Sequence, residues 1–371
     1  QKMSKAIESI LGHVPLTEAL RATASGVPNP FPDEFFQVSS ANRILGDRAK
    51  YIRISGERRT AKRAMYGSPA RRRSLKDIGD QTIRMLHEYE SFPIDMMMLQ
   101  KLRSFEQYQQ DEGMDWVAYQ LKEASTRHMN ARVIATASVL RYGAIYWDSN
   151  GNLLPSSSGA DTNFTVDMQV PATHKDQCNG NISASWALVN TDIPTDIANL
   201  QQYSQQETGL RLTACLYGVN VAKYIRQNNF CQAFLSRNPG FNDKMVTTNE
   251  IPDGLFGIEK WIPVYSSFFV SDNDTTVNEM WDDDLAVFVP NVAQPDKMVW
   301  WAMYEGSMPV PRTLDVQRDP MAAIKSAEIV YGMGSYAVAG HNPMGVEVYH
   351  FDTMLPGIKN EKAPFMADVA F

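Results

Sequence analysis

The sequence predicts an α+β protein in which strand segments precede and follow one very long helix. Between Phe105 and Tyr142 the chain has no proline and a single glycine, Gly113, as is typical of a continuous helix. Segments before and after it are rich in strand-forming residues and are separated by turn residues, which indicates strands. A chain of 371 residues with 44% hydrophobic residues can bury one large core or two smaller ones.

Residues 1–42 are expected to form an N-terminal arm that contains a small helix. Ile7, Ile10, Leu11 and Val14 stand at helical spacing, which favours a short amphipathic helix. The following stretch GVPNPFPDE has the composition of a loop.

Residues 43–76 predict an extended hairpin. Tyr51, Ile52 and Ile54 suit a strand, whereas Gly56 and the GSP stretch at 67–69 permit bends. Two arms of ~17 residues at ~3.3 Å each would extend roughly 55 Å, and a compact domain of this length has a radius of gyration of about 21 Å. An isolated two-stranded hairpin is marginal in water, so this arm is expected to need a partner outside its own body.

An apolar stripe runs along the long helix, which is expected to act as a spine of ~45 Å. Its members recur at alternating steps of three and four residues: Met114, Val117, Leu121, Ala124, His128, Ala131 and Ala135. On this stripe His128 is interpreted as a core or interface residue and not as a ligand.

The chain after Gly143 mixes strands and helices. AIYWDSNGNLLP predicts a hairpin with an Asn-Gly turn, and NFTVDMQVP predicts a further strand. TDIPTDIANLQQYSQQETG has Asp or Thr caps, an early proline and a closing glycine, which favours a helix. LRLTACLYG should be a strand and VNVAKYIRQN a helix, and the remaining strand segments are GIEKWIPVYSSFFV, LAVFVP, SAEIVY and GVEVYHF.

The charges are separated along the chain into two opposite poles. The net charge of −7 argues against nucleic-acid binding over the whole surface. Residues 43–76 hold twelve Lys or Arg and two acidic residues, whereas residues 248–319 hold thirteen Asp or Glu and four basic residues. The basic segment could therefore contact either nucleic acid or an acidic protein surface.

Cys178, Cys215 and Cys231 are odd in number and far apart, which predicts buried free thiols in a reducing compartment. No apolar run approaches the ~18 residues of a membrane span, and Gln1–Pro15 lacks the continuous apolar stretch of a signal peptide. We therefore expect synthesis in a cytoplasm.

Three stretches resemble enzyme or metal motifs, but each has a structural interpretation. GMGSYA at 332–337 has dinucleotide-site spacing, yet a strand-like segment follows where a helix would have to begin. Asp282, Asp283 and Asp284 cannot all converge on one cation from a strand, so we interpret them as a solvated strand entry or a docking patch for a basic partner. His174 and Cys178 lack the second ligand pair of a zinc site.

The chain also lacks the G-x-S-x-G, H-E-x-x-H and P-loop motifs. The sequence therefore predicts no catalytic residues, no cofactor and no metal, although an enzyme of another type stays open as a minority hypothesis. Unlike patches on each copy favour head-to-tail self-assembly into rings or lattices.

The order of these segments resembles the major capsid proteins of tailed phages, which have the Hong Kong 97-type fold. Three stretches are similar to the lambda-type major capsid protein E group: RHMNARVIATASVLRYGAIYWDSNGNLL, WALVNTDIPTDIANLQQYSQQETG, and IPDGLFGIEKWIPVYSSFF followed by DDDLAVFVPN. The resemblance covers roughly residues 90–371 and depends on pattern and segment order.

The resemblance implies a domain organisation. Residues 1–42 would be the N-terminal arm and 43–76 the extended loop that lies across an adjacent subunit. Residues 77–185 and 326–371 would form the peripheral domain, with the spine helix at about 103–142 and its sheet drawn from about 143–185 and 326–371. Residues 186–325 would form the axial domain.

The resemblance also implies a function. The chain would self-assemble into hexamers and pentamers of an icosahedral head that encloses double-stranded DNA, within a virion assembled in the host cytoplasm. Further partners would be scaffold, portal and decoration proteins, without membrane contact. The alternative is a nucleic-acid-binding protein that uses the basic arm at 50–76. The expected intersubunit residues are Arg53, Arg58, Arg59, Lys62, Arg63, Arg71, Arg72, Arg73, Asp282, Asp283 and Asp284.

Overall fold

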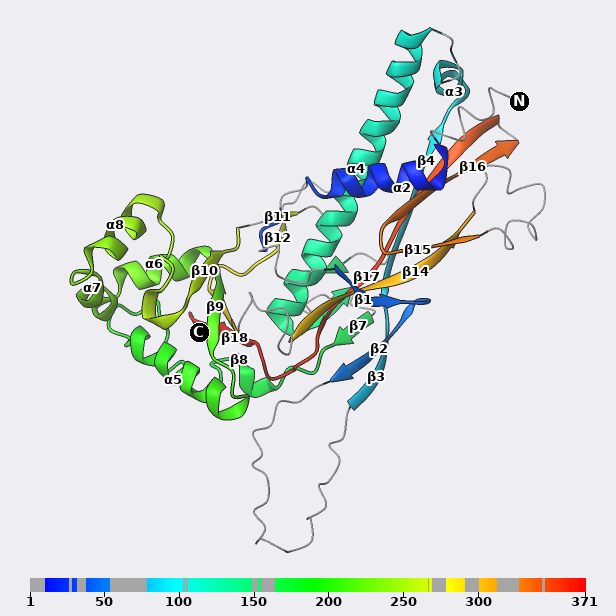
Figure 1. The fold of residues 1–371 in the computed structure, drawn as a ribbon. Coiled ribbons are helices and arrows are strands. Elements are labelled where there is room, and N and C mark those ends of the chain that lie inside the picture. Colours follow the sequence, from blue (N-terminus) through cyan, green and yellow to red (C-terminus); the bar gives the residue numbers. More distant parts are fainter. Residues whose placement is uncertain are drawn as a thin grey trace, which may run out of the picture.

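A computed structural model describes most of the chain and contains both helices and sheets. The described residues are 11–26, 29–31, 38–53, 79–102, 104, 106–148, 153–154, 164–265, 267–268, 278–290, 300–311, 327–341 and 344–371. They form two lobes, with the long helix α4 (Gln107–Tyr142) standing against the larger sheet and a helix-rich second lobe beside its C-terminal end (Figure 1). The prediction of an α+β protein is confirmed.

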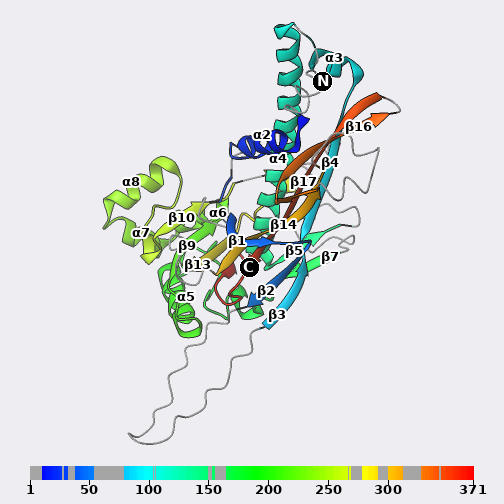
Figure 2. The ribbon, with the colours of Figure 1, turned by 45° about the vertical axis from the view of Figure 1, so that its right-hand side comes forward.

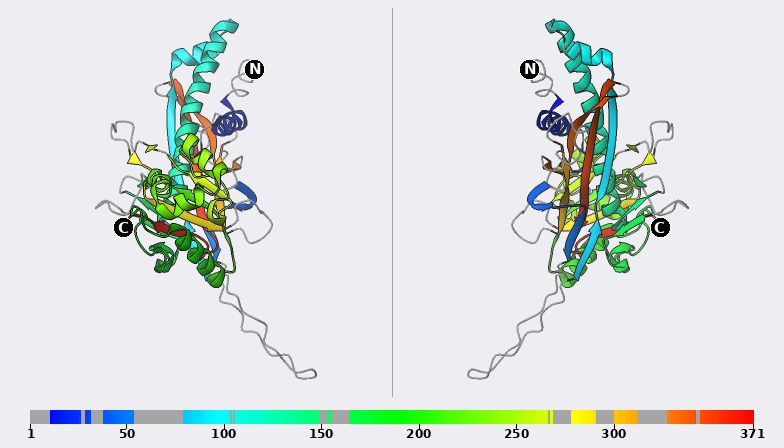
Figure 3. Two further views of the ribbon diagram at one scale, coloured as in Figure 1. Left: turned by 90° about the vertical axis from the view of Figure 1, so that its left-hand side faces the viewer. Right: turned by 90° about the vertical axis from the view of Figure 1, so that its right-hand side faces the viewer.

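The first lobe is built on a six-stranded sheet. Its strands are β1 (Val38–Ile44), β4 (Leu86–Ile94), β14 (Trp301–Val310), β15 (Glu328–Tyr331), β16 (Gly334–His341) and β17 (Met344–Ile358). The 15-residue strand β17 is central: β4 pairs along one side of it, and β16 and then β14 pair along the other, all antiparallel. Strand β1 adds in parallel to β14. Figure 3 shows α4 running in the same general direction as the long strands.

The predicted long helix is present as α4, which ends at the predicted residue and begins four residues after the predicted start at about 103. It begins at Gln107 and ends at Tyr142, where Gly143 adopts a left-handed conformation with φ of 67° and donates its backbone N–H to the carbonyl of Val139. Glycine adopts this conformation without steric cost, and a Cβ at this position would stand 2.8 Å from Val170 Cγ2. Five members of the predicted stripe are buried, whereas Met114 is 39% exposed and Ala131 is half-buried.

The N-terminal segment packs onto the first lobe. Helix α2 (His13–Ala24) contacts α4 and β16 and buries Leu16 and Leu20. Of the predicted small helix at Ile7–Val14, residues 7–10 lie outside the described part of the chain. Helix α2 begins at His13, within the predicted helix, and continues for ten residues beyond Val14. Helix α3 (Met96–Leu102) packs against the N-terminal part of α4.

The predicted hairpin is present at its base. Strands β2 (Arg48–Arg53) and β3 (Gly79–Arg84) pair antiparallel from Arg48 with Arg84 to Arg53 with Gly79. Residues 54–78, between the two strands, lie outside the described residues. The start of the predicted loop at residue 43 is wrong, because Arg43 belongs to β1 and pairs with β14.

The second lobe holds a five-stranded sheet in the order β10, β9, β13, β18, β8. These strands are β8 (Lys175–Asp176), β9 (Leu212–Tyr217), β10 (Lys260–Pro263), β13 (Leu285–Pro290) and β18 (Phe365–Asp368). Its helices are α5 (Ile193–Glu207), α6 (Val219–Gln227), α7 (Asn229–Leu235) and α8 (Pro239–Thr248), with short 3-10 turns at Ala172–His174 and Leu255–Gly257. Figure 2 shows α5 and α8 at opposite ends of this lobe.

Two small sheets complete the described structure. Strand β5 (Ala144–Trp147) pairs with β6 (Leu153–Leu154) and β7 (Phe164–Asp167), as the predicted hairpin requires; the Asn-Gly turn itself lies outside the described residues. Strands β11 (Ser267–Phe268) and β12 (Asn278–Glu279) form the other pair.

Two strands belong to a different sheet from the one that the predicted domain boundaries imply. Strand β14 falls within the predicted 186–325 domain but pairs with β17 of the first lobe, and β18 falls within the predicted 326–371 part but pairs with β13 of the second lobe. The segment 143–185 supplies β5, β6, β7 and β8, none of which joins the six-stranded sheet. The predicted source of that sheet is therefore wrong for 143–185, because long-range pairing decides which strands meet.

Candidate interaction site

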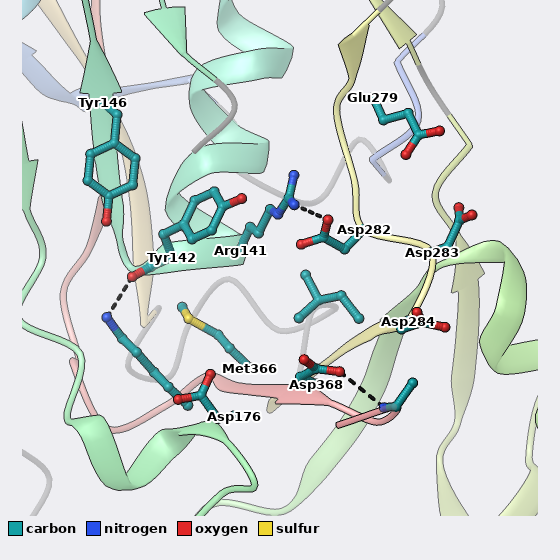
Figure 4. Close-up of a pocket in the computed structure, with 13 residues that line it drawn as sticks. Arg141, Tyr142, Tyr146, Asp176, Glu279, Asp282, Asp283, Asp284, Met366 and Asp368 are labelled. Carbon is teal, nitrogen blue, oxygen red and sulfur yellow. Dashed lines mark hydrogen bonds and ion pairs between the residues drawn. The ribbon is translucent and has the colours of Figure 1, made fainter. Parts of the chain in front are cut away.

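An acidic cleft of about 580 Å³ lies where the C-terminal end of α4 meets the second lobe (Figure 4). The acidic residues that line it are Asp176, Glu279, Asp282, Asp283, Asp284 and Asp368. Two basic residues, Arg141 and Lys175, line it as well. The cleft therefore carries a surplus of negative charge and suits a basic partner in its electrostatics.

The two basic residues of the cleft are held by the end of α4. Arg141 lies in the last turn, its guanidinium rests 4.8 Å from the ring centroid of Tyr142, and it forms an ion pair with Asp282. Lys175 Nζ donates to the carbonyl oxygen of Tyr142 at 2.6 Å. Cations at a helix C-terminus also interact favourably with the helix dipole. Because Arg141 pairs with Asp282 and Lys175 binds the carbonyl of Tyr142, these two contacts join the end of α4 to the second lobe.

The predicted acidic triad divides into three different environments. The exposed Asp282 carboxylate pairs with Arg141. The half-buried Asp284 carboxylate accepts from Asn220 Nδ2 at 3.0 Å and from the Tyr224 hydroxyl at 2.7 Å. Asp283 is exposed, and no ion pair within the described ranges involves its carboxylate. The three carboxylates therefore do not converge on one point, as expected for adjacent residues in an extended segment.

The backbone of the triad fits closely against the start of α6. A Cβ at Gly218 would stand 2.2 Å from the carbonyl oxygen of Asp282 and 2.4 Å from that of Asp283, so only glycine fits there. The Asp283 carbonyl also accepts from the backbone N–H of Asn220 at 3.0 Å. Burial, reinforced by the hydrogen bond and charge of Asp284, raises the pKa of Tyr224 to about 12, which keeps this hydroxyl a donor at neutral pH.

Of the predicted basic contact residues, Arg53 falls within the described residues. Arg53 is the last residue of β2. Arg58, Arg59, Lys62, Arg63, Arg71, Arg72 and Arg73 fall in the segment 54–78, outside the described residues. The three acidic residues of the predicted set therefore line one cleft. The contacts of the eight basic residues stay a prediction.

The enzyme-like motifs have structural roles. GMGSYA opens strand β16 at Gly334 instead of a helix, so it lacks the helix N-terminus on which a dinucleotide site depends. His174 is buried against Phe365, with ring centroids 4.1 Å apart. Cys178, Cys215 and Cys231 are buried free thiols, as predicted, and burial raises the pKa of each.

The described residues contain no group of three or more His, Cys, Asp or Glu side chains that could hold a metal ion. None of the helices in the described part of the chain is both long and apolar enough to cross a membrane.

Sequence reasoning missed the partners that define the site. The pairing of Arg141 with Asp282 joins residues 141 positions apart, and Asp368 enters the cleft from the last strand of the chain. The only local signal was the basic residue in the last turn of the long helix, which is a common place for a cation.

Comparisons with known proteins identify the fold. No protein-family model matches the chain, and no curated protein matches it. Among solved structures, the "putative capsid protein of prophage" from E. coli CFT073 is 15% identical with a TM-score of 0.54, over 97% of this chain and 99% of that one. A phage-related protein from Bordetella bronchiseptica RB50 is 9% identical with a TM-score of 0.50, over 95% and 97%. The chain therefore has the α+β fold that the prophage capsid protein displays, as the sequence predicted.

Proposed function

We propose that this chain is a major capsid protein that self-assembles into the shell of a phage head. The observation that carries the proposal is the structural likeness to the prophage protein over almost the full length of both chains. In this proposal hexamers and pentamers form an icosahedral shell around double-stranded DNA, and the protein resides in the virion after assembly in the host cytoplasm. It acts through contacts between copies and not through catalysis.

The first lobe, with α4 and the six-stranded sheet, would serve as the peripheral domain, and the second lobe as the axial domain around the five-fold and six-fold axes. The chain contributes β14 to the sheet of the first lobe and β18 to the sheet of the second lobe. These crossings support a fixed position of one lobe relative to the other. Scaffold, portal and decoration proteins are proposed as additional partners.

The basic segment after β2 is proposed to contact a neighbouring copy. The β2–β3 hairpin carries the chain into a segment with seven Lys or Arg between residues 58 and 73. Such clustered like charges repel one another unless an opposite charge meets them. The acidic cleft, and Asp283 in particular, offers that charge on a second copy.

A shortened hairpin tests this proposal. Because Arg53 and Gly79 are the last paired residues of the hairpin, residues 54–78 can be replaced by Asn-Gly, a two-residue turn that suits antiparallel strands. We expect a folded subunit, with unchanged circular dichroism, that no longer forms shells in sedimentation velocity and negative-stain electron microscopy. Normal shells from this variant would contradict the role of the segment.

A matched variant separates charge from length. It keeps residues 54–78 but replaces the seven Lys or Arg between 58 and 73 with Gln. If the charges meet the acidic cleft, this variant should also fail to assemble, and Asp283→Asn should weaken assembly in the same direction. Assembly at wild-type level in both would show that the contact does not depend on charge.

The alternative function, nucleic-acid binding through the basic arm, predicts a different result. Binding to DNA would then weaken steeply between low and moderate salt, because each phosphate contact releases counterions. Nuclease-treated protein that forms large particles without nucleic acid would favour the shell, whereas monomers that bind DNA with a steep salt slope would favour the alternative.

A further inference from the structure

The middle of α4 is attached to the sheet by ionisable side chains. His128 and Arg132 lie one turn apart on the face of α4 that meets β17. His128 Nδ1 lies 2.9 Å from Glu88 Oε2 of β4, and His128 Nε2 lies 2.9 Å from His350 Nδ1 of β17. His128 is 1% exposed and His350 is 3% exposed, so the two imidazoles meet away from water.

The second half of this charged cluster extends across the sheet. Arg132 donates from Nε and Nη2 to both oxygens of the fully buried Asp352, at 2.5 and 2.7 Å. Arg132 Nη2 also lies 3.4 Å from Glu305 Oε1, and Arg43 Nε reaches the other Glu305 oxygen at 3.4 Å. Four strands, β1, β4, β14 and β17, thus contribute to one band of charge beneath the helix.

Apolar contacts flank this band on both sides. Toward the N-terminal end of α4, Val117, Leu121 and Ala124 belong to one buried apolar cluster with Val348. Toward the C-terminal end, Val133, Ala137 and Leu140 belong to a buried apolar cluster that continues into strands β9 and β13 of the second lobe. Buried ion pairs are often matched or exceeded in stability by apolar residues of similar size, so stability alone does not account for a charged band between two apolar zones.

Protonation of the two histidines is unequal. Burial lowers the pKa of His128, but the hydrogen bond and charge of Glu88, together with Asp352 and Glu90, outweigh it and raise the pKa overall. Burial, reinforced by the charges of His128 and Arg127, lowers the pKa of His350 to about 3. The cluster therefore favours one proton on the pair and opposes a second.

We propose that the His128–His350 contact is an acid-sensitive latch that holds α4 on the sheet and releases it when both imidazoles carry a proton. A second proton would place two cations in direct contact, with Arg127 and Arg132 on the same helix and His87 on β4 nearby. Among the described residues, the carboxylates of Glu88, Glu90, Glu305 and Asp352 offset this charge. The latch acts within one chain, so its test does not depend on assembly.

The sign of the pH effect follows from His350. Its ordinary pKa is ~6.5, and the folded state lowers this to about 3. The contribution of His350 to the latch is therefore fully present above pH ~6.5 and is lost as the pH falls toward about 3. At pH 4.5 the equilibrium for opening should have risen by about a hundredfold through this residue alone.

Amide hydrogen exchange of the purified full-length chain tests the latch. Protection, corrected for the intrinsic pH dependence of exchange, should fall between pH 7 and 4.5 in peptides that cover residues 121–136 of α4. Strand β9, buried in the second lobe, provides the internal reference. His350→Gln retains a polar side chain without a titratable group, so this variant should keep α4 protected at pH 4.5. His174→Gln, in the second lobe, should leave the response of α4 unchanged.

Two results would overturn the latch. One is a parallel loss of protection in α4 and β9 of the wild type, which would indicate global acid unfolding. The other is a response of α4 in His350→Gln that matches the wild type. Should His350→Gln fail to fold, the wild-type comparison of α4 with β9 still decides the question.

Discussion

The two lobes bury histidines in opposite ways. In the first lobe His350 contacts a second imidazole within a charged cluster beneath α4. In the second lobe His174 stacks on Phe365, with an interplanar angle of 14°, and its Nδ1 lies 3.3 Å from the carbonyl oxygen of Pro364. The apolar core of this lobe includes Trp186, Tyr217 and Phe288, each no more than 1% exposed. The helix–sheet interface therefore buries a charged band between two apolar zones, whereas the second lobe stacks its histidine on an aromatic ring.

Removal of a large side chain from the second lobe should give the largest effect on stability. Phe288 is fully buried in β13, between β9 and β18. Phe288→Ala should lower the free energy of unfolding by about 3–5 kcal/mol, because the lost burial leaves a cavity. Urea denaturation measures this change. Phe371→Ala, at a residue that is 47% exposed, is the matched control, and equal effects of the two variants would show that this core is not tightly packed.

Removal of one charge beneath α4 should have a somewhat smaller effect. Asp352→Asn takes away the carboxylate that holds Arg132, and breaking a buried pair typically costs 3–5 kcal/mol. We expect about 3 kcal/mol, because Glu305 remains as a second partner of Arg132. The double variant Arg132→Met/Asp352→Leu should recover much of the loss in thermal unfolding. A double variant no more stable than Asp352→Asn would show that the interface requires charge.

Removal of a helix cap should give the smallest effect on stability, and this effect should be confined to the second lobe. The Asp192 carboxylate accepts from the backbone N–H of Thr195 at 3.2 Å and from its hydroxyl at 2.8 Å. Asp192→Ala should cost about 1 kcal/mol and raise amide exchange in the first turn of α5. Asp192→Asn should be nearly neutral, because Asn caps helices about as well. Increased exchange in α4 would show that the lobes do not respond separately.

Elements whose signals are local could be read from the sequence. The absence of proline predicted α4, and the Asp192 cap, Pro194 and Gly209 bounded α5. The strand-like residues at 51–52 predicted the hairpin that β2 and β3 form. The resemblance of segment order to phage capsid proteins predicted a fold that the structural comparison supports. In each case residues near in sequence carried the information.

Features that depend on distant residues were missed. The sequence could not indicate that β14 would join the first lobe or β18 the second, because strand pairing depends on packing between segments far apart in the chain. It predicted His128 as a core residue but gave no sign of Glu88 or His350, which lie 40 and 222 positions away.

The sequence by itself indicated α4, α5 and α6, many of the strands, the two charge poles and the free cysteines, because propensity, capping and composition act over a few residues. It did not indicate α3, α7 or α8. Only the tertiary structure decided how the acidic triad divides its partners and where charge is buried. Both depend on which side chains meet across the fold, and the energy of a buried charge is set by those neighbours and by the loss of water around it.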